Sequence, residues 1–226
     1  ERTLGCVVEL SSEMIEPGIV QRNTSKKKTW FGLGTLDDIN NQHYEDVKNL
    51  LNCAGKVSVC KDILSAKWMK LLVNTMSLGP FALLGLPVQE GLNTPGMRDL
   101  VLAIGDETMS LGHELGYNIE PIMGLSKEVM TESNRLPETL LDTLVEHIGP
   151  SARDCILQDM LKGRRTEIDM INGLVVEELS KLERVAPYNA AVIEVGNMIV
   201  SGQLSPKPEN INILKKIIRR NLDKVE

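Results

Sequence analysis

The chain has 226 residues, of which 42% are hydrophobic, and a formal net charge of −6. This length and composition allow a sizeable buried core, in one domain or in one domain plus a fragment. The acidic balance argues against a nucleic-acid-binding protein, whose footprint is usually a basic patch. The chain begins at Glu1, without a methionine or a signal-like leader, so we expect a piece of a longer protein.

Four cysteines and three histidines are scattered along the chain. The closest cysteine pair, Cys53 and Cys60, is spaced too widely for a zinc knuckle. His113 has acidic neighbours on its helix but no second histidine at metal-ligand spacing. We therefore expect no metal site, and reduced, mostly packed thiols in a cytoplasmic protein.

The first 60 residues have the pattern of a small α/β piece. Runs rich in β-branched and aromatic residues predict strands at about 5–10, 19–23, 29–33 and 56–60, with a helix over about 36–52. Pro17 and Gly18 predict a turn before the second strand. Gly32 and Gly34 imitate a dinucleotide phosphate loop, but the third glycine is missing and Asp37 would oppose a pyrophosphate.

From residue 61 onward the pattern is helical almost throughout. We predict helices at about 61–78, 95–115, 126–134, 137–148, 151–162, 166–183, 188–201 and 208–224. The uncharged stretch 71–88 has the length of a membrane span, but Gly79 and Pro80 interrupt it. We expect a buried helix that ends there in a turn, and no membrane association. The predicted domains are therefore an α/β remnant, 1–60, and an all-α domain, 61–226.

The predicted helix at 61–78 carries a narrow polar stripe. Lys70, Asn74 and Ser77 fall on one side of the helical wheel, whereas Trp68 and Leu72 face the core. A solvated helix edge would give the same pattern. On the wall of a cleft, however, a lysine would donate a proton to a carbonyl that is being reduced, or polarise it.

A second polar group lies on the predicted helix at 166–183. Glu167 falls within an apolar arc that includes Ile168, Met170 and Ile171, where a carboxylate is costly unless it is paired. The alternative is a first-turn carboxylate that interacts favourably with the helix dipole. Gly173, in mid-helix, predicts the close approach of another backbone or of a ligand.

These motifs, in this order, resemble the ketopantoate reductase (2-dehydropantoate 2-reductase) family. The resemblance rests on Lys-Trp-Met-Lys at 67–70 with Asn74, Thr-Glu-Ile-Asp at 166–169, Asn-Gly at 172–173 and Ala-Pro-Tyr-Asn at 186–189. Residues 4–34 also look like the last strands of the family's nucleotide-binding domain. The resemblance implies the end of a Rossmann domain followed by a helical domain like that of 6-phosphogluconate dehydrogenase. The Gly-rich half of the Rossmann domain is missing here.

The resemblance implies an NADPH-dependent oxidoreductase that reduces ketopantoate to pantoate for pantothenate and coenzyme A synthesis. It makes Lys70 the catalytic general acid and Asn74 a substrate ligand. Glu167 would act in catalysis, near the nicotinamide ribose and the substrate hydroxyl. NADPH would bind mostly to the missing N-terminal segment, so we expect the isolated chain to be inactive. The resemblance also implies a homodimer through the helical domain.

Two positions depart from the family pattern. Leu78 stands where the family usually has a second asparagine, and Cys155 stands where it has a serine that binds the substrate carboxylate. Ser77 and Ser151 are near enough in sequence to compensate. A 2-keto acid is thus a firmer expectation than ketopantoate. The alternatives are a related hydroxyacid or opine-type dehydrogenase and a non-catalytic helical module that dimerises or binds a partner.

Overall fold

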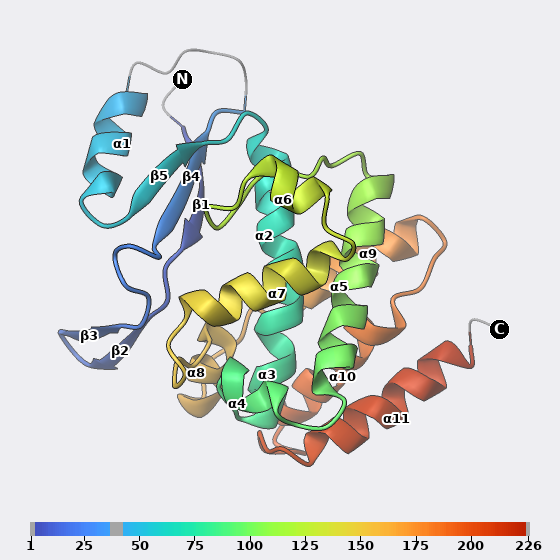
Figure 1. Cartoon of the computed structure of the whole chain (residues 1–226). Coiled ribbons are helices and arrows are strands. Elements are labelled where there is room, and N and C mark those ends of the chain that lie inside the picture. The colour runs from blue at the N-terminus through green and yellow to red at the C-terminus, as the bar shows by residue number, and fades with distance from the viewer. Residues whose placement is uncertain (1–2, 37–42, 225–226) are drawn as a thin grey trace. The chain divides into compact units, whose positions relative to one another are not determined.

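The computed structural model describes residues 3–36 and 43–224. The helices and strands run in the order β1 (Gly5–Glu9), β2 (Ser12–Glu16), β3 (Ile19–Arg22), β4 (Trp30–Gly34), α1 (Tyr44–Asn52), β5 (Lys56–Val59), α2 (Ile63–Ser77), α3 (Gly79–Leu84), α4 (Val88–Leu92), α5 (Met97–Glu114), α6 (Lys127–Thr131), α7 (Leu136–His147), α8 (Cys155–Leu161), α9 (Ile168–Lys181), α10 (Pro187–Val200) and α11 (Asn210–Leu222). Strands come first and helices follow (Figure 1), which confirms the predicted fold class.

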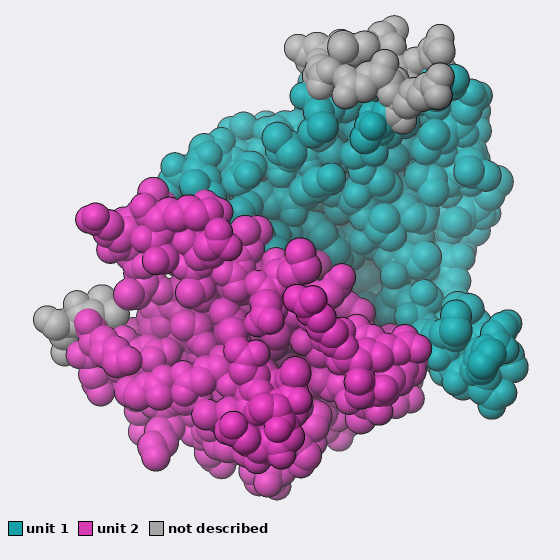
Figure 2. Space-filling view, turned by 180° about the vertical axis from the view of Figure 1, so that it is seen from behind, with its two compact units in different colours: residues 1–71, 112–149 teal, residues 72–111, 150–226 magenta. Residues whose placement is uncertain are grey.

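The chain forms two compact units, coloured separately in Figure 2. Unit 1 contains residues 1–71 and 112–149, and unit 2 contains residues 72–111 and 150–226. Both units therefore draw on the part of the chain that the sequence predicts as one helical domain. The division falls within α2 and α5 rather than near residue 60.

A three-stranded sheet forms one side of unit 1. Its central strand, β4, pairs antiparallel with β1 and parallel with β5, and all five of its residues are buried. A Cβ atom on Gly34 would lie 2.8 Å from the Cys60 carbonyl oxygen and from Ile63 Cβ, and one on Gly32 would lie 2.7 Å from Cys60 Sγ. Close packing therefore explains these glycines without a phosphate loop.

Strands β2 and β3 form a separate two-stranded ribbon that projects from unit 1 (Figure 1). The predicted turn is confirmed, since Gly18 connects the strands with φ +83°, a conformation that glycine adopts freely. Strand β2 was missed by the sequence prediction. Met14 and Ile15 are both exposed, so β2 lacks the alternation of a strand with one buried face.

Helix α2 ends at Ser77, as the Gly79-Pro80 pair predicts. The expected turn after it is limited to Leu78, because residues 79–84 form the fully buried helix α3 with Pro80 in its first turn. Proline is tolerated there, since the first amides of a helix have no intrahelical acceptor. The short helix α4 was also missed. Among the described residues, no helix has the length and apolar character needed to cross a bilayer.

In unit 2, α10 packs against α9, α11 and α3. A Cβ atom on Gly196 of α10 would lie 2.8 Å from Ile168 Cδ1, so the helices touch at this glycine. No other backbone approaches Gly173 closely, because the nearest atom to a Cβ there would be 3.8 Å away, an ordinary contact. The close approach of a ligand at Gly173 stays a prediction. The sequence shows that a glycine lies within a helix, but it does not show whether another helix packs against that glycine.

Both tryptophans of the chain are buried in unit 1. Trp30 of β4 donates a hydrogen bond to Ser58 at 2.9 Å. Trp68 of α2 stacks on Tyr117 with ring centroids 4.6 Å apart and an interplanar angle of 12°. Gly112 of α5 allows this arrangement, because a side chain there would collide with the Trp68 indole.

Candidate active site

Lys70 lies on α2 within unit 1 and is ion-paired. Its Nζ atom lies 2.8 Å from Oε2 of Glu9, which is the last residue of β1. The Lys70 side chain is 25% exposed, while that of Glu9 is only 9% exposed. Trp68 and Met69 are buried in the core, whereas Lys67 is exposed. The two lysines of the motif therefore occupy different environments, and Lys70 is the one with a specific partner.

Glu9 is a site residue that the sequence alone did not predict. Residues Gly5, Val7 and Glu9 are the buried positions of β1, so the alternation of a half-buried strand places Glu9 on the inward face. One of its oxygens, Oε2, faces Lys70. The other, Oε1, is buried and has no hydrogen bond among the described residues. A buried carboxylate oxygen without a donor is costly and calls for an explanation.

The polar stripe of α2 is only partly open. Asn74, one turn after Lys70, is partly exposed, as the prediction requires. Ser77 is only 2% exposed and its hydroxyl donates to the Val73 carbonyl oxygen at 2.7 Å. To bind a ligand, Ser77 would have to leave this backbone partner. Leu78, the departure from the family pattern, is partly exposed just after the helix.

The structure corrects the interpretation of Glu167. The residue precedes the first turn of α9 and is exposed, rather than lying within an apolar arc. Met170, which the helical wheel assigned to that arc, is 71% exposed, while Ile168 and Ile171 are buried. The wheel was wrong about Glu167 because it assumed helical geometry from residue 166, whereas α9 begins at Ile168 and Glu167 lies before it. The exposed carboxylate therefore needs no buried counter-charge.

Cys155 is the first residue of α8 and lies near Glu167, also in unit 2. Desolvation of the sulfur, together with the charges of Asp154 and Glu167, raises the pKa of the Cys155 thiol to about 11. The thiol is therefore protonated at neutral pH and can act as a weak hydrogen-bond donor. Two of the predicted site residues, Cys155 and Glu167, therefore interact electrostatically within unit 2.

Asp154 caps α8 by accepting a hydrogen bond from the Leu157 amide at 2.8 Å. Its other oxygen, Oδ2, is buried and has no described partner. Burial raises the pKa of Asp154 to about 7, although the amides at the start of α8 act in the opposite direction. Asp154 is therefore a carboxyl group that titrates near neutrality.

A buried polar network links α2, α5, α9 and α10 within unit 2. The Glu107 carboxylate accepts hydrogen bonds from the Tyr188 and Asn189 amides, each at 2.9 Å, and from the Asn189 side chain at 2.8 Å. The Asn172 side chain donates to Asn189 at 2.9 Å and to the Thr75 carbonyl oxygen at 3.2 Å. The network therefore fixes the backbone beside Asn74 to the start of α10.

The candidate residues are divided between the two units. Lys70 and its partner Glu9 belong to unit 1, and Asn74, Cys155 and Glu167 belong to unit 2. That Lys70 and Glu167 meet in one water-poor cleft stays a prediction. Within the described residues, no cluster of three or more His, Cys, Asp or Glu side chains could hold a metal ion.

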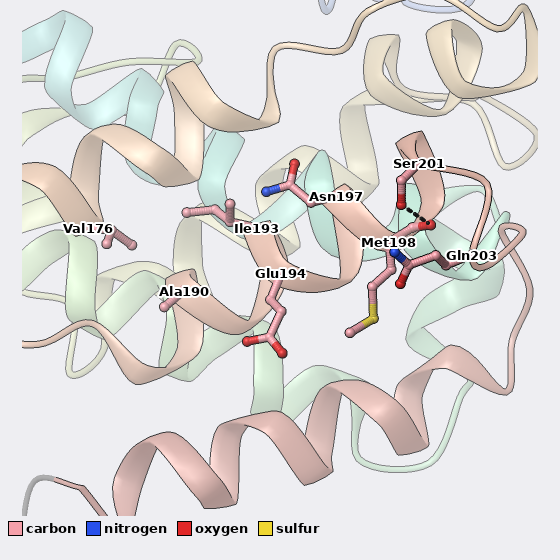
Figure 3. Close-up of a pocket in the computed structure, with 8 residues that line it drawn as sticks. All are labelled: Val176, Ala190, Ile193, Glu194, Asn197, Met198, Ser201 and Gln203. Atoms are coloured by element: carbon pink, nitrogen blue, oxygen red, sulfur yellow. Dashed lines mark hydrogen bonds between the residues drawn. The ribbon is translucent and has the colours of Figure 1, made fainter.

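Unit 2 also contains a hollow of about 550 Å³ that none of the candidate residues lines (Figure 3). Its lining comes from α9, α10 and the segment that follows α10, and includes Val176, Ile193, Glu194, Asn197 and Met198. Four of the eight lining side chains are apolar, and among the eight Glu194 alone is ionisable. A hollow lined by a single ionisable group is a poor candidate for proton transfer.

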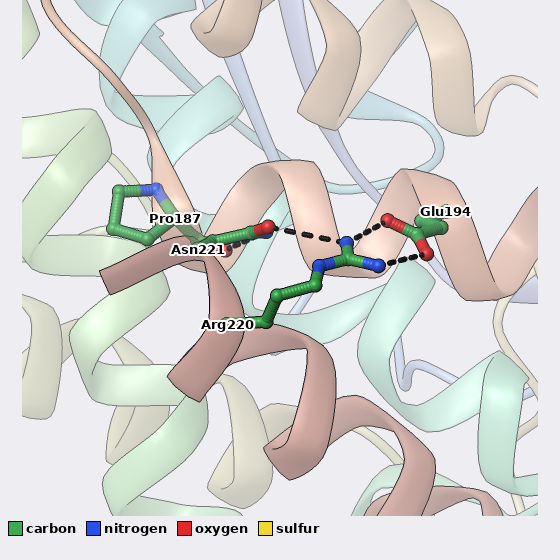
Figure 4. A network of polar contacts seen from close by, with 4 residues as sticks. All are labelled: Pro187, Glu194, Arg220 and Asn221. Atoms are coloured by element: carbon green, nitrogen blue, oxygen red, sulfur yellow. Dashed lines mark hydrogen bonds and ion pairs between the residues drawn. The ribbon is translucent and has the colours of Figure 1, made fainter. Parts of the chain in front are cut away.

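The same face of unit 2 carries a surface ion pair that fastens α11 to α10 (Figure 4). The Arg220 guanidinium makes two hydrogen bonds to the Glu194 carboxylate. Asn221 accepts a third from Arg220 at 3.2 Å and donates to the Pro187 carbonyl oxygen at 3.2 Å. Arg220 of α11 therefore has a structural role, because it fastens α11 to α10.

The fold is shared with nicotinamide-dependent oxidoreductases of known structure. D-mandelate dehydrogenase, solved in complex with NADH, matches with a TM-score of 0.70 and 20% identity over 88% of this chain and 62% of its own. A dimeric ketopantoate reductase from Staphylococcus aureus matches with a TM-score of 0.65 and 15% identity, over 89% of this chain and 63% of its own. At these identities the matches show a shared fold.

The chain belongs to the ketopantoate reductase family. The family model for the C-terminal domain, described as ketopantoate reductase PanE/ApbA C terminal, matches residues 62–199. A 2-dehydropantoate 2-reductase from Pyrococcus horikoshii is 28% identical over 194 residues, which cover 83% of this chain and 57% of the relative. The chain thus spans little more than half the length of this relative.

Proposed function

We propose that this chain is the substrate-side part of an enzyme that reduces a 2-keto acid with NADPH, with ketopantoate as the substrate and pantoate as the product. One observation carries the proposal. In a chain of this family, the Lys70 ammonium is ion-paired and partly exposed one turn before Asn74, on a helix that is otherwise largely buried. A lysine held in this way is suited to donate a proton to a carbonyl oxygen.

The proposed roles follow from the chemistry of each side chain. When bound, the nicotinamide cofactor supplies the hydride. Lys70 gives its proton to the keto oxygen as negative charge develops there, and Asn74 orients the substrate by hydrogen bonding. Glu167 accepts hydrogen bonds from hydroxyl groups of the substrate and of the nicotinamide ribose, and the neutral Cys155 thiol lies beside the substrate carboxylate.

Residues of this chain fit the reacting end of the cofactor better than its phosphate end. Packing explains Gly32 and Gly34, and no other glycine-rich loop follows a strand in the sequence. The proposed activity therefore belongs to a polypeptide that also carries a nucleotide-binding domain. We expect the 226-residue chain alone to bind NADPH with a dissociation constant well above the micromolar range in calorimetry.

A second candidate is the reduction of a more apolar 2-keto acid. It is supported by Leu78 and Cys155, which replace two hydrogen-bonding groups of the family pattern. Each lost hydrogen bond to a small polar acid would weaken binding by about 1–3 kcal/mol if nothing replaced it. D-mandelate dehydrogenase, which is named for an aromatic 2-hydroxy acid, has the same fold.

The deciding experiment is an assay of the product of the complete reading frame that contains this chain. NADPH oxidation would be followed with ketopantoate and with a panel of aliphatic and aromatic 2-keto acids. A kcat/KM for ketopantoate at least tenfold above the others would support the first candidate, and the reverse order the second. No oxidation with any of these acids would contradict both and favour a non-catalytic helical module.

We also propose a homodimer formed through the helical domain. It is supported by the Staphylococcus aureus ketopantoate reductase of the same fold, which is dimeric. Sedimentation equilibrium of the 226-residue chain tests this directly. A mass of about twice the 25.0 kDa of one chain is the expected result. A single species of one chain's mass at high protein concentration would contradict it.

A further inference from the structure

We propose that Glu9 is the positioning residue of the reductase: it holds the Lys70 ammonium in its donating orientation and weakens the binding of anionic substrates. This inference rests on the proposed function and extends it to a residue of the sheet. It starts from the 2.8 Å contact between Lys70 Nζ and Glu9 Oε2, a distance typical of a charge-assisted hydrogen bond.

The geometry leaves Lys70 capable of chemistry while it is held. An ammonium has three N–H donors. One of them donates a hydrogen bond to Glu9, so the others remain available for a substrate carbonyl oxygen. A lysine side chain is otherwise flexible, with up to about 2 kcal/mol of rotamer entropy to lose when it is fixed. Because Glu9 already fixes the end of the Lys70 side chain in the free enzyme, less rotamer entropy is lost when the reacting complex forms.

Stability does not account for the pair. A buried ion pair is often no more stabilising than apolar residues of the same size, because both charges lose their hydration. Glu9 is 9% exposed in its side chain, yet its Oε1 atom makes no hydrogen bond to a described residue. The nearby His147 Nδ1 is also buried without a partner, and the charge of Glu9 acts on this imidazole. Incomplete hydrogen bonding is tolerated more readily where a site needs it for function than in a purely structural core.

The charge of Glu9 also affects the substrate. A 2-keto acid carries a carboxylate next to the keto group, so its approach to Lys70 brings two anions close together. Like charges at short range repel each other, and the repulsion opposes the attraction to Lys70. Glu9 therefore improves the orientation of the proton donor at the expense of affinity.

The kinetic test uses three variants of the complete enzyme. Glu9→Gln should lower kcat by about 10- to 100-fold, as expected when a catalytic group is misplaced, and should lower KM for the keto acid several-fold. Glu9→Asp keeps the charge but is one methylene shorter, so kcat should fall with KM unchanged. Glu16→Gln makes the same change of charge at an exposed position of unit 1 and should change neither constant.

A purely structural role would give a different result. It would reduce the amount of folded enzyme, and so lower the apparent kcat of Glu9→Gln without lowering KM. Thermal unfolding followed by circular dichroism identifies variants that do not fold. An unchanged kcat in folded Glu9→Gln, or a KM that does not fall, would overturn the proposal.

A chemical measurement on the 226-residue chain separates this proposal from the proposed function. Trace acetylation with acetic anhydride, read by peptide mass spectrometry, gives the reactivity of Lys70 relative to the exposed Lys67. The ratio should rise several-fold in Glu9→Gln and stay constant in Glu16→Gln, because the ammonium is no longer held. An unchanged ratio would overturn the positioning role whatever the enzyme reduces. A raised ratio in a protein that reduces no keto acid would instead refute the reductase, and leave the pair without a catalytic task.

Discussion

Two glutamates, the buried Glu9 in unit 1 and the partly buried Glu107 in unit 2, differ in how completely their carboxylates are hydrogen-bonded. Glu107 in unit 2 accepts three hydrogen bonds from the first turn of α10 and uses both of its oxygens. Glu9 in unit 1 has a lysine on one oxygen and no described partner on the other. The first arrangement is complete and needs no ligand. The Glu9 carboxylate has an incomplete set of hydrogen bonds and lies beside the partly exposed Lys70 ammonium. This combination is expected of a site that carries out chemistry.

The largest predicted effect concerns the cation of the incomplete pair. Lys70→Arg keeps a positive charge beside Glu9, but a guanidinium does not give up its proton at neutral pH. We expect kcat of the complete enzyme to fall by about 10²- to 10⁴-fold, the usual contribution of general acid catalysis. Steady-state kinetics with ketopantoate measure the fall. Turnover near that of the wild type would remove Lys70 from the proton-transfer step.

A large loss of stability is predicted when the hydrogen-bond network around Glu107 is broken. Asn189→Leu removes a side chain that donates to Glu107 and accepts from Asn172. Because both partners then stay buried with fewer hydrogen bonds, we expect the free energy of unfolding to fall by about 3–5 kcal/mol. Urea denaturation of the 226-residue chain measures it. Asn197→Leu, the same substitution at an exposed position of α10, is the control and should have little effect.

The hydrogen bonding of Asp154 is intermediate between that of Glu107 and that of Glu9. One of its oxygens caps α8, and the other has no described partner. Its pKa is raised by folding to about 7, so the folded protein holds this proton more tightly than the unfolded chain. The resulting stability is present at acidic pH and is lost as the pH rises from the ordinary carboxyl range through about 7.

Asp154→Asn keeps the cap but cannot ionise. Between about pH 4 and pH 8, the wild type should lose about 2–3 kcal/mol more than this variant, from roughly 1.4 kcal/mol per unit of pKa, reduced for partial exposure. Urea denaturation at several pH values provides the comparison, with Asp159→Asn on the same helix as a control. Parallel pH profiles for the wild type and Asp154→Asn would show that Asp154 ionises normally.

The smallest effects concern two glycines of unit 2. A Cβ atom on Gly79 would lie 2.9 Å from Asn172 Oδ1 and from Val192 Cγ1, so Gly79→Ala should cost about 1–3 kcal/mol. Gly173 has no such neighbour, and Gly173→Ala should stabilise the chain by about 0.5–1 kcal/mol through better helix propensity. Thermal unfolding of the two variants distinguishes them by sign. Destabilisation by Gly173→Ala would instead support the sequence-based prediction that another group lies close to Gly173.

The sequence predicted the elements whose pattern is local and strong. Four strands, the Pro17-Gly18 turn and most long helices follow from β-branched runs, glycines and helical periodicity. The ribbon strand β2 was not predicted, because its apolar residues Met14 and Ile15 are exposed on opposite faces. The helices α3 and α4 were not predicted, because they are too short to show a helical period. The predicted start of a helix near residue 36 falls partly at residues 37–42, outside the described residues.

The candidate site was only partly predictable. Lys70 and Asn74 were found because a polar stripe stands out on an apolar helix. The predicted environment of Glu167 was wrong because the helical wheel was applied to a residue that precedes α9, where the spacing of 100° per residue does not hold. Glu9 was missed because its partner is 61 positions away in the sequence, and only the fold brings β1 against α2. Pairings of this kind depend on tertiary structure rather than on local pattern.

The placement of the aromatic residues has a spectroscopic consequence. Trp30 and Trp68 are the only tryptophans of the chain, and both belong to unit 1. Excitation near 295 nm, which selects indole, therefore reports on the melting of unit 1 alone, whereas the far-ultraviolet signal of the helices reports on both units. If the units melt independently, the two optical signals will give different midpoints in a single sample.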